Sequence, residues 1–150
     1  MIAAESAIVR KLTARDAGAV YTIESRCFTM PWTERQCASA FAQKAFLAYG
    51  VFQSTVLIAY VTTYHVLDEF EILNIAVLPE FRRMGIARHL LLTTLQEAKK
   101  MAIQNICLEV RVTNSAAIGL YENCGFIRTG VRPHYYPDTG EDALLYQRRV

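Results

Sequence analysis

A short basic segment with a single glycine, Arg82-Arg83-Met84-Gly85-Ile86-Ala87, is the first candidate for chemistry in this sequence. It lies between an expected strand and a leucine-rich helix, where the first backbone N–H groups of the helix lack partners and can hold a phosphate. Gly85 permits close approach of the backbone to a pyrophosphate, and the arginines supply positive charge. The same residues are equally consistent with a solvated basic loop that only starts a helix. The segment matches neither the G-x-x-x-x-G-K-[ST] nor the G-x-G-x-x-G motif, which disfavours mononucleotide kinases and dehydrogenases.

Two further residues carry groups that can move protons. Glu109 falls on an expected strand over Asn105 to Val112, on the face opposite to the strand's apolar residues. Its carboxylate is either a reactive group or a solvated acid paired with Arg111 or another cation. Tyr121 lies one turn beyond Ala117 on the next helix, where it is either a proton donor or a packed core aromatic.

Aromatic residues gather in two loop segments. Tyr135 and Tyr136 are bounded by prolines, and Trp32 follows Pro31 between the first two expected helices. Packing is the default role of such side chains. No metal is expected, because no partners at ligand spacing accompany the three histidines, His65, His89 and His134.

The elements that must position these residues follow from the apolar periodicity. Thr13 and Thr33 are N-cap candidates, Ser54-Thr55 separates two β-rich runs as a hairpin turn, and Gly125 closes the last helix. We expect helices over 14–28, from Thr33 onward, over 86–100 and over 115–124, and strands over 7–12, 46–53, 56–66, 70–78, 105–112, 126–136 and 143–149. The order β-α-α-β-β-β-α-β-α-β-β predicts an α/β or α+β sandwich with at least one right-handed crossover between parallel strands.

Length and composition limit the classes of protein. The chain has 150 residues, 53% of them hydrophobic, and a net charge of +2, which favours one domain over 1–150 and disfavours binding of nucleic acid by bulk charge. No stretch matches a signal peptide or a membrane span, so a cytoplasmic location without membrane attachment is expected. Reduced, mostly packed thiols are expected at the four cysteines, Cys27, Cys37, Cys107 and Cys124.

The basic segment and its surroundings resemble a known signature. Asn74-Ile75-Ala76-Val77, Pro79 and Arg82-x-x-Gly85-x-Ala87 are similar to the acetyl-coenzyme A motif [QR]-x-x-G-x-[GA] of the GNAT N-acetyltransferases, and the order of elements fits that family over nearly the whole chain. The narrower resemblance is to the protein N-terminal acetyltransferases, and within them to the branch that acetylates an N-terminal alanine of a ribosomal protein. It is carried by three segments, 108–121, Cys124-Gly125-Phe126 and Arg132-Pro133-His134-Tyr135-Tyr136-Pro137 with Glu141-Asp142-Ala143.

This resemblance implies a GNAT fold, a mixed central sheet flanked by helices, and acetyl-coenzyme A (acetyl-CoA) as cosubstrate. Backbone groups of Ile75, Ala76 and Val77 would pair with the pantetheine arm, and Asn114 would meet that arm on its other side. The pyrophosphate would be held by N–H groups of the turn Arg83, Met84, Gly85, Ile86, Ala87 and Arg88.

The resemblance also implies roles for the proton-carrying groups. Glu109 would be the general base that deprotonates the substrate ammonium, and Tyr121 the general acid that protonates the departing thiolate. An ordinary glutamate is a weak base for an ammonium, so either burial or a water chain must assist the transfer. Trp32, Tyr135 and Tyr136 would line the groove that receives a peptide N-terminus.

We therefore expect a monomeric enzyme that transfers the acetyl group to the α-amine of a protein, a ribosomal protein with a small first residue. Two other functions remain open. One is a GNAT enzyme for a lysine side chain or a small amine, and the other is a non-catalytic acyl-CoA-binding module.

Overall fold

A computed structural model of the chain describes residues 8–150, and Ala7 of the first expected strand lies outside the described residues. The strands are β1 (Val9–Lys11), β2 (Phe46–Gln53), β3 (Val56–Val66), β4 (Glu69–Val77), β5 (Asn105–Arg111), β6 (Ile127–Arg132) and β7 (Ala143–Arg149). The helices are α1 (Ala17–Cys27), α2 (Glu34–Phe41), α3 (Ile86–Lys100) and α4 (Ser115–Asn123), with short 3-10 turns η2 (Ala14–Asp16) and η3 (Pro79–Phe81). This order matches the predicted one.

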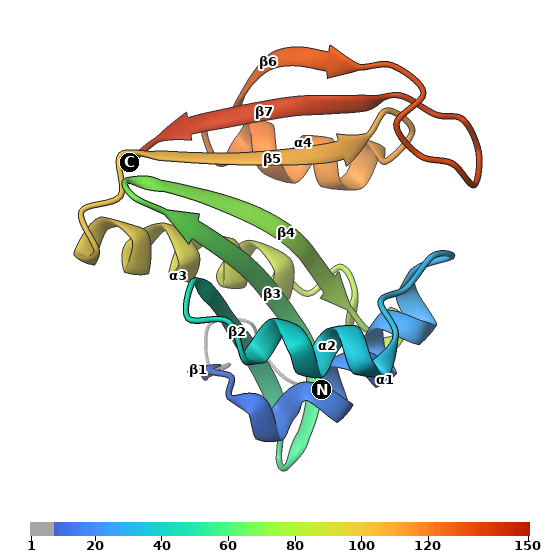
Figure 1. Ribbon diagram of the computed structural model, residues 1–150, viewed down its shortest axis with the longest axis vertical. Coiled ribbons are helices and arrows are strands. Elements are labelled where there is room, and N and C mark those ends of the chain that lie inside the picture. Colours follow the sequence, from blue (N-terminus) through green and yellow to red (C-terminus); the bar gives the residue numbers. More distant parts are fainter. Residues whose placement is uncertain (1–7) are drawn as a thin grey trace.

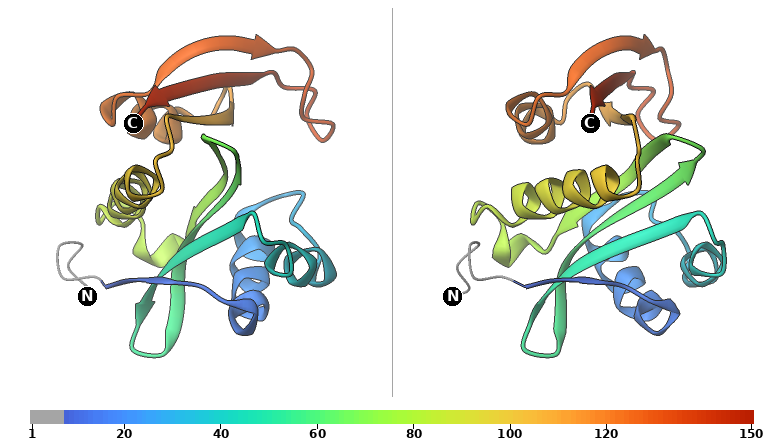
Figure 2. Two further views of the ribbon diagram at one scale, coloured as in Figure 1. Left: turned by 60° about the vertical axis from the view of Figure 1, so that its left-hand side comes forward. Right: turned by 90° about the vertical axis from the view of Figure 1, so that its left-hand side faces the viewer.

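The seven strands form one mixed sheet in the order β1-β2-β3-β4-β5-β7-β6. Helices α1 and α2 cover one face of it, and α3 and α4 cover the other (Figure 2). Strands β4 and β5 are the parallel pair, and α3 connects them as the predicted crossover helix. The fold class predicted from the sequence is confirmed.

Local signals in the sequence fix several of these elements. Thr33 caps α2, since its hydroxyl accepts the N–H of Gln36 at 3.1 Å while the Gln36 side chain accepts the N–H of Thr33 at 2.9 Å. On α3, Leu90 and Leu91 are fully buried against the sheet. All four cysteines are free, with Cys37 and Cys124 buried and Cys27 and Cys107 half-buried.

Strands β4 and β5 separate partway along their length. They pair only from Glu69–Asn105 to Ile72–Leu108, and the next residue on β4, Leu73, is a bulge that has no partner on β3. Beyond the bulge, the rest of β4 stays on β3 while β5 pairs with β7. Figure 1 shows the resulting division, with β5, β7 and β6 in the upper part of the molecule and β2, β3 and β4 in the lower part. A wedge-shaped gap in backbone pairing therefore opens between the two parallel strands.

The strand expected over 126–136 is shorter than predicted. Strand β6 ends at Arg132 because Pro133 has no N–H to give to a ladder, and His134 follows with a φ of 51°. The N–H of His134 instead donates to the Asp142 side chain at 2.9 Å. The segment 133–142 is thus a loop that leads from β6 to β7, and it carries Tyr135 and Tyr136 with it.

Candidate active site

The open edge of β4 carries the backbone predicted to hold the pantetheine arm. The N–H of Leu78 donates to the carbonyl of Ile58 on β3, so strand alternation directs Ala76 toward β3 and directs Ile75 and Val77 away from it, toward the wedge. The carbonyl of Val77 accepts a hydrogen bond from Nε of Arg82 at 2.9 Å and another from the Cys27 thiol. Ile75 and the N–H of Val77 are therefore the backbone groups that face the wedge, whereas the backbone of Ala76 belongs to the pairing with β3.

The predicted phosphate turn sits at the start of α3, next to this edge. Arg83 and Gly85 adopt left-handed φ values of 63° and 78°, and Gly85 is the N-cap of the helix. His89 is the first residue whose N–H reaches back into the helix, to the carbonyl of Gly85 at 3.0 Å. The N–H groups of Ile86, Ala87 and Arg88 precede it and have no intrahelical acceptor, which suits an anion. Ile86 anchors the turn with a side chain that is only 1% exposed, and Met84 and Ala87 also pack against the core.

Asn114 lies across the wedge, between β5 and α4. Its side-chain oxygen accepts the N–H of Ala117 at 3.2 Å and caps α4. This bond uses the carbonyl oxygen and leaves the amide donors of the exposed side chain for another partner. A capping role and the predicted contact with the cofactor arm are therefore compatible.

Glu109 lies on the β5 strand beyond the last residue paired with β4. Its carboxylate forms an ion pair with Arg132 of β6, at 3.2 Å, and accepts a hydrogen bond from Tyr135 that raises the pKa of that phenol. Arg111, the other cation considered from the sequence, binds Asp138 instead, with two bonds of 2.8 and 2.9 Å. The side chain of Glu109 keeps 21% of its surface exposed, so solvent or a ligand can reach it.

Tyr121 is nearly enclosed, in contrast to Glu109. The residue is 7% exposed and its ring packs against Phe126, with the centroids 5.8 Å apart. Burial, followed by the proximity of Tyr136, raises the pKa of Tyr121 to about 12. No hydrogen bond within residues 8–150 engages its hydroxyl. Tyr136 is in turn close enough to Glu109 for that carboxylate to raise the pKa of Tyr136, although burial is the larger cause. These three side chains therefore share one region of the molecule.

The two loop segments with aromatic residues are joined to each other. Thr29, in the loop between α1 and α2, donates its hydroxyl to Asp138 of the β6–β7 loop at 2.7 Å. Asp138 also binds Arg111, whose guanidinium carbon lies 4.0 Å from the centroid of the Tyr136 ring. Trp32, in the same loop as Thr29, packs its ring beside Phe46, at 6.3 Å between centroids.

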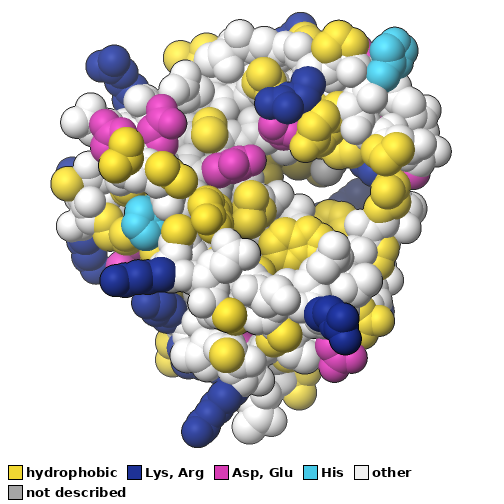
Figure 3. Space-filling model, in the orientation of Figure 1, with side chains coloured by type: hydrophobic (Ala, Val, Ile, Leu, Met, Phe, Trp, Pro, Cys, Tyr) yellow, Lys and Arg dark blue, Asp and Glu magenta, His cyan; other side chains and the backbone are white. Residues whose placement is uncertain are grey.

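Tyr135 and Tyr136 meet edge to face, with their centroids 5.1 Å apart. Figure 3 shows a hollow on this side of the molecule, between the part that carries β6 and β7 and the part that carries α1 and α2. The predicted substrate-binding residues thus come from two loops that the Thr29–Asp138 bond connects.

Sequence reasoning assigned no role to Arg132 or Asp138. Both carry charge beside the aromatic pair, Arg132 at 5.2 Å from the centroid of the Tyr135 ring and Asp138 through Arg111. Arg132 precedes Pro133 and Asp138 follows Pro137. Because proline restricts the backbone of a loop, this pattern could have indicated that the two charges have fixed positions beside the tyrosines.

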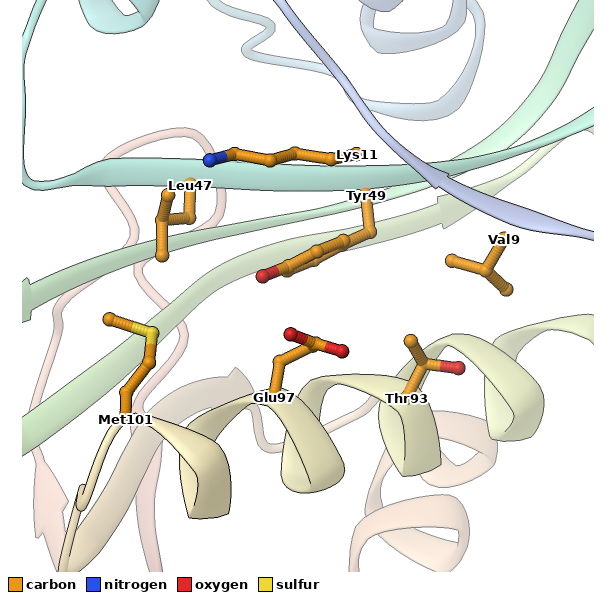
Figure 4. A pocket seen from close by; sticks show the side chains of 7 residues that line it. All are labelled: Val9, Lys11, Leu47, Tyr49, Thr93, Glu97 and Met101. Atoms are coloured by element: carbon orange, nitrogen blue, oxygen red, sulfur yellow. The ribbon is translucent and has the colours of Figure 1, made fainter.

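A cavity of about 380 Å³ lies elsewhere, between β1, β2 and α3 (Figure 4). Lys11, Tyr49, Thr93 and Glu97 line it together with apolar side chains, and none of the predicted site residues does. The wedge is the stronger candidate because the open backbone edge of β4 faces it and Glu109 stands on β5 just beyond the last residue paired with β4. Within residues 8–150, no helix is both long and apolar enough to cross a membrane. No three metal-ligating side chains of that range lie together.

Comparison with known proteins gives a consistent result. Residues 17–126 match the model of the acetyltransferase (GNAT) family. A [ribosomal protein bS18]-alanine N-acetyltransferase of Escherichia coli is 38% identical over 91% of this chain and 93% of its own length. The enzyme of that name from Salmonella typhimurium is 35% identical over 89% of this chain and 91% of its own. The crystal structure of the ribosomal-protein-S18-alanine N-acetyltransferase from Escherichia coli superposes with a TM-score of 0.90 at 36% identity, over 96% of this chain and 94% of that one.

Proposed function

Because the chain belongs to the acetyltransferase (GNAT) family, we propose that it transfers the acetyl group of acetyl-CoA to the N-terminal α-amine of a ribosomal protein that begins with alanine. The relatives named above are bS18-alanine N-acetyltransferases and match this chain over nearly its whole length. The observation that carries the proposal is that an accessible carboxylate, Glu109, and an enclosed phenol, Tyr121, both lie close to Tyr136, with Glu109 on β5 just beyond its pairing with β4.

GNAT enzymes take the acetyl group from acetyl-CoA, and the wedge has groups that fit this cosubstrate. Ile75 and Val77 present the open strand edge, and an amide-rich pantetheine arm can pair with such an edge as a further strand would. The start of α3, from Arg83 to Arg88, offers N–H groups and positive charge to the pyrophosphate. Asn114 would close the site from the β5 side with its free amide donors.

The two proton-carrying side chains suit a direct transfer without a covalent enzyme intermediate. Glu109 takes a proton from the substrate ammonium, directly or through a water, and the neutral amine attacks the thioester carbon. The carbon–sulfur bond then breaks, Tyr121 gives its proton to the departing thiolate, and the extra proton on the acetylated nitrogen is released and restores the phenol. The pKa of about 12 supports this role, because the phenol stays protonated throughout the physiological range. Holding the amine and the thioester together supplies much of the rate.

An α-amine is the acceptor that this arrangement favours. Terminal amines titrate near 7.7–8.0 and lysine near 10.4, so at neutral pH the neutral form of lysine is roughly 300-fold scarcer. A single carboxylate, without a second base, would also favour the less basic α-amine over a lysine side chain, because the lysine ammonium is harder to deprotonate. Trp32, Tyr135 and Tyr136 would narrow the groove around the first residues of the peptide and admit alanine or serine.

The proposal is tested with a panel of peptides that differ at the first residue, assayed for acetyl transfer by mass spectrometry. We expect acetylation at the terminus of a peptide that begins with alanine. The same peptide with a blocked terminus and a free internal lysine should remain unmodified. Efficient transfer to the blocked peptide would instead assign the enzyme to lysine side chains. Acetyl-CoA binding without release of free thiol in the presence of any peptide would identify a non-catalytic module.

A variant in the groove adds a second arm to this test. Tyr136→Ala removes a ring that Arg111 and Tyr135 hold in place. It should raise the KM for the alanine peptide and leave the affinity for acetyl-CoA near that of the wild type, since the ring is proposed to contact the peptide alone. Weaker acetyl-CoA binding with an unchanged peptide KM would remove Tyr136 from the peptide groove.

A further inference from the structure

Glu24 is a buried acid on the inner face of α1. Its neighbours on that face, Val20 and Ile23, are each 1% exposed, and Glu24 itself is 2% exposed. No ion pair within residues 8–150 includes it. A carboxylate in such a place is costly unless hydrogen bonds replace its water, so its partners indicate what it does there.

Three donors from three different elements satisfy the carboxylate. The Tyr60 hydroxyl on β3 and the Asn74 amide on β4 both donate to Oε1, the latter at 2.9 Å. The backbone N–H of Trp32 donates to Oε2 at 3.0 Å. Oε1 therefore binds side chains of the sheet, and Oε2 binds the backbone of the loop between α1 and α2. The pKa of Tyr60 is raised, first by burial and then by this carboxylate, so Tyr60 remains a donor.

Glu24 thus forms a bridge from Asn74 on β4 to the backbone of Trp32. These two ends lie at the parts of the site that the reaction must bring together. Asn74 follows the bulge at Leu73 and precedes Ile75, where β4 leaves β5. Trp32 precedes Thr33, which caps α2, in the loop that also provides Thr29 to the β6–β7 loop. An apolar side chain would fill the same volume, but it could hold neither the amide of β4 nor the backbone of the loop.

We propose that Glu24 is a positioning residue that fixes the peptide-binding loop against the cofactor-binding strand. Its carboxylate sets the separation between the Trp32 backbone and β4, and through it the width of the groove in which the α-amine meets the thioester. This assignment rests on the proposed function for its catalytic consequence. The attachment of the loop itself does not depend on which amine is acetylated.

The variant Glu24→Gln separates the two ends of the bridge. Glutamine keeps the length of the side chain but has a single acceptor oxygen, and its NH2 group is a donor. With the oxygen on Tyr60 and Asn74, the NH2 group faces the N–H of Trp32, and the loop loses its anchor. The matched control is Tyr60→Phe, which removes a buried donor from the same carboxylate and leaves the bonds to Asn74 and Trp32 intact.

Trp32 is the single tryptophan of the chain, so its fluorescence reports on the loop directly. We expect Glu24→Gln to increase the quenching of this fluorescence by acrylamide about twofold or more, while Tyr60→Phe stays near the wild type. In peptide acetylation, Glu24→Gln should raise the KM for the alanine peptide about tenfold and change kcat and the affinity for acetyl-CoA by less than about threefold.

Quenching in a folded Glu24→Gln variant that equals the wild type would overturn the inference. Equal increases in quenching and KM for both variants would also overturn it, because they would indicate general loosening of the core. If Glu24→Gln fails to fold, the double variant Glu24→Met/Tyr60→Phe replaces two buried partners by apolar groups of similar shape and is judged by the same quenching measurement. A wild-type chain that acetylates no peptide would refute the proposed function only, since quenching still tests the loop.

Discussion

The guanidinium of Arg132 lies 3.2 Å from the carboxylate of Glu109, although the two residues stand on strands that are not neighbours in the sheet. The ion pair reaches across β7, and Arg132 also lies over the ring of Tyr135. An approaching substrate ammonium would therefore meet a carboxylate that already has a cation beside it. Arg132 is more than half exposed, so the pair is screened by solvent and the substrate can compete for the carboxylate.

This relationship gives a test that separates a base from a structural acid. Glu109→Gln should lower turnover by roughly 10²–10⁴ at neutral pH, with acetyl-CoA affinity close to the wild type, because shape is kept and the base is lost. Turnover of the variant should recover at high pH, where the amine is already neutral. Arg132→Gln is the control, since it removes the same ion pair and leaves the carboxylate. Equal losses of turnover in the two variants would indicate that Glu109 acts only as the ion-pair partner of Arg132 and is not the base.

Tyr121→Phe should lower turnover by a similar factor, roughly 10²–10⁴, because the leaving thiolate loses its proton donor. Since burial raises the pKa of Tyr121 to about 12, the difference in absorbance at 295 nm between wild type and variant should titrate near that value. The raised pKa favours the neutral phenol in the folded state, so its contribution to stability is complete below pH 10 and is lost as the pH rises through about 12.

Tyr146→Phe provides the control for this loss. Tyr146 is also buried, and its hydroxyl donates to Glu122 at 2.7 Å outside the wedge. Its removal should cost stability and leave turnover nearly unchanged. Near-normal turnover of Tyr121→Phe would exclude the phenol as the general acid.

The parts of this structure that were predictable from the sequence are those with local causes. The bounds of β2 and β3 follow from runs of β-branched and aromatic residues around Ser54-Thr55, and α2 begins where Thr33 can cap it. The pairing of Glu109 with Arg132 had no local cause, because it depends on β7 lying between β5 and β6. The end of β6 was signalled by Pro133, yet the hydrophobic and aromatic residues beyond it favoured a longer strand.

The candidate site was predictable to a similar degree. The turn at Gly85 is a local pattern, whereas the wedge depends on a bulge at Leu73, and the sequence around Leu73 has no glycine or proline to mark it. Glu24 had a signal that went unused, an acid on the apolar stripe of α1 directly after Ile23. Its partners lie on three separate elements and become apparent only in three dimensions.

Gly85→Val should weaken the binding of acetyl-CoA at least about tenfold, or about 1.4 kcal/mol, because the side chain enters the space proposed for the pyrophosphate. Because Gly85 has a φ of 78°, valine should also cost about 1–2 kcal/mol of folding free energy. Gly140→Val is the matched control, since Gly140 has a φ of 74° and open space around its Cα. It should lose similar stability and keep its affinity in calorimetry. Equal affinities in the two variants would contradict the phosphate turn.

Asp138 gives a prediction for low pH. Hydrogen bonds from Arg111, followed by one from Thr29, hold the pKa of its carboxyl below the ordinary value of 3.8. A lowered pKa means that the charged form stabilises the folded state, so this contribution is present above pH 3.8 and is lost as the pH falls further. Asp138→Asn should therefore lower the Tm at pH 7, and the difference from the wild type should shrink as the pH falls below 3.8 and the carboxylate becomes protonated.

The same variant tests whether the two loops act together in peptide binding. Asparagine removes the charge that holds Arg111 under Tyr136 and weakens the link to Thr29. The KM for the alanine peptide should rise several-fold, while the affinity for acetyl-CoA should not change, because Asp138 binds Thr29 and Arg111, neither of which is among the proposed cofactor-binding residues. Asp142→Asn is the control in the same loop, since Asp142 binds the backbone of His134 and neither Thr29 nor Arg111. A higher KM in both variants would indicate that any loosening of the loop suffices, and an unchanged KM in Asp138→Asn would show that the peptide does not sense the bond between the loops.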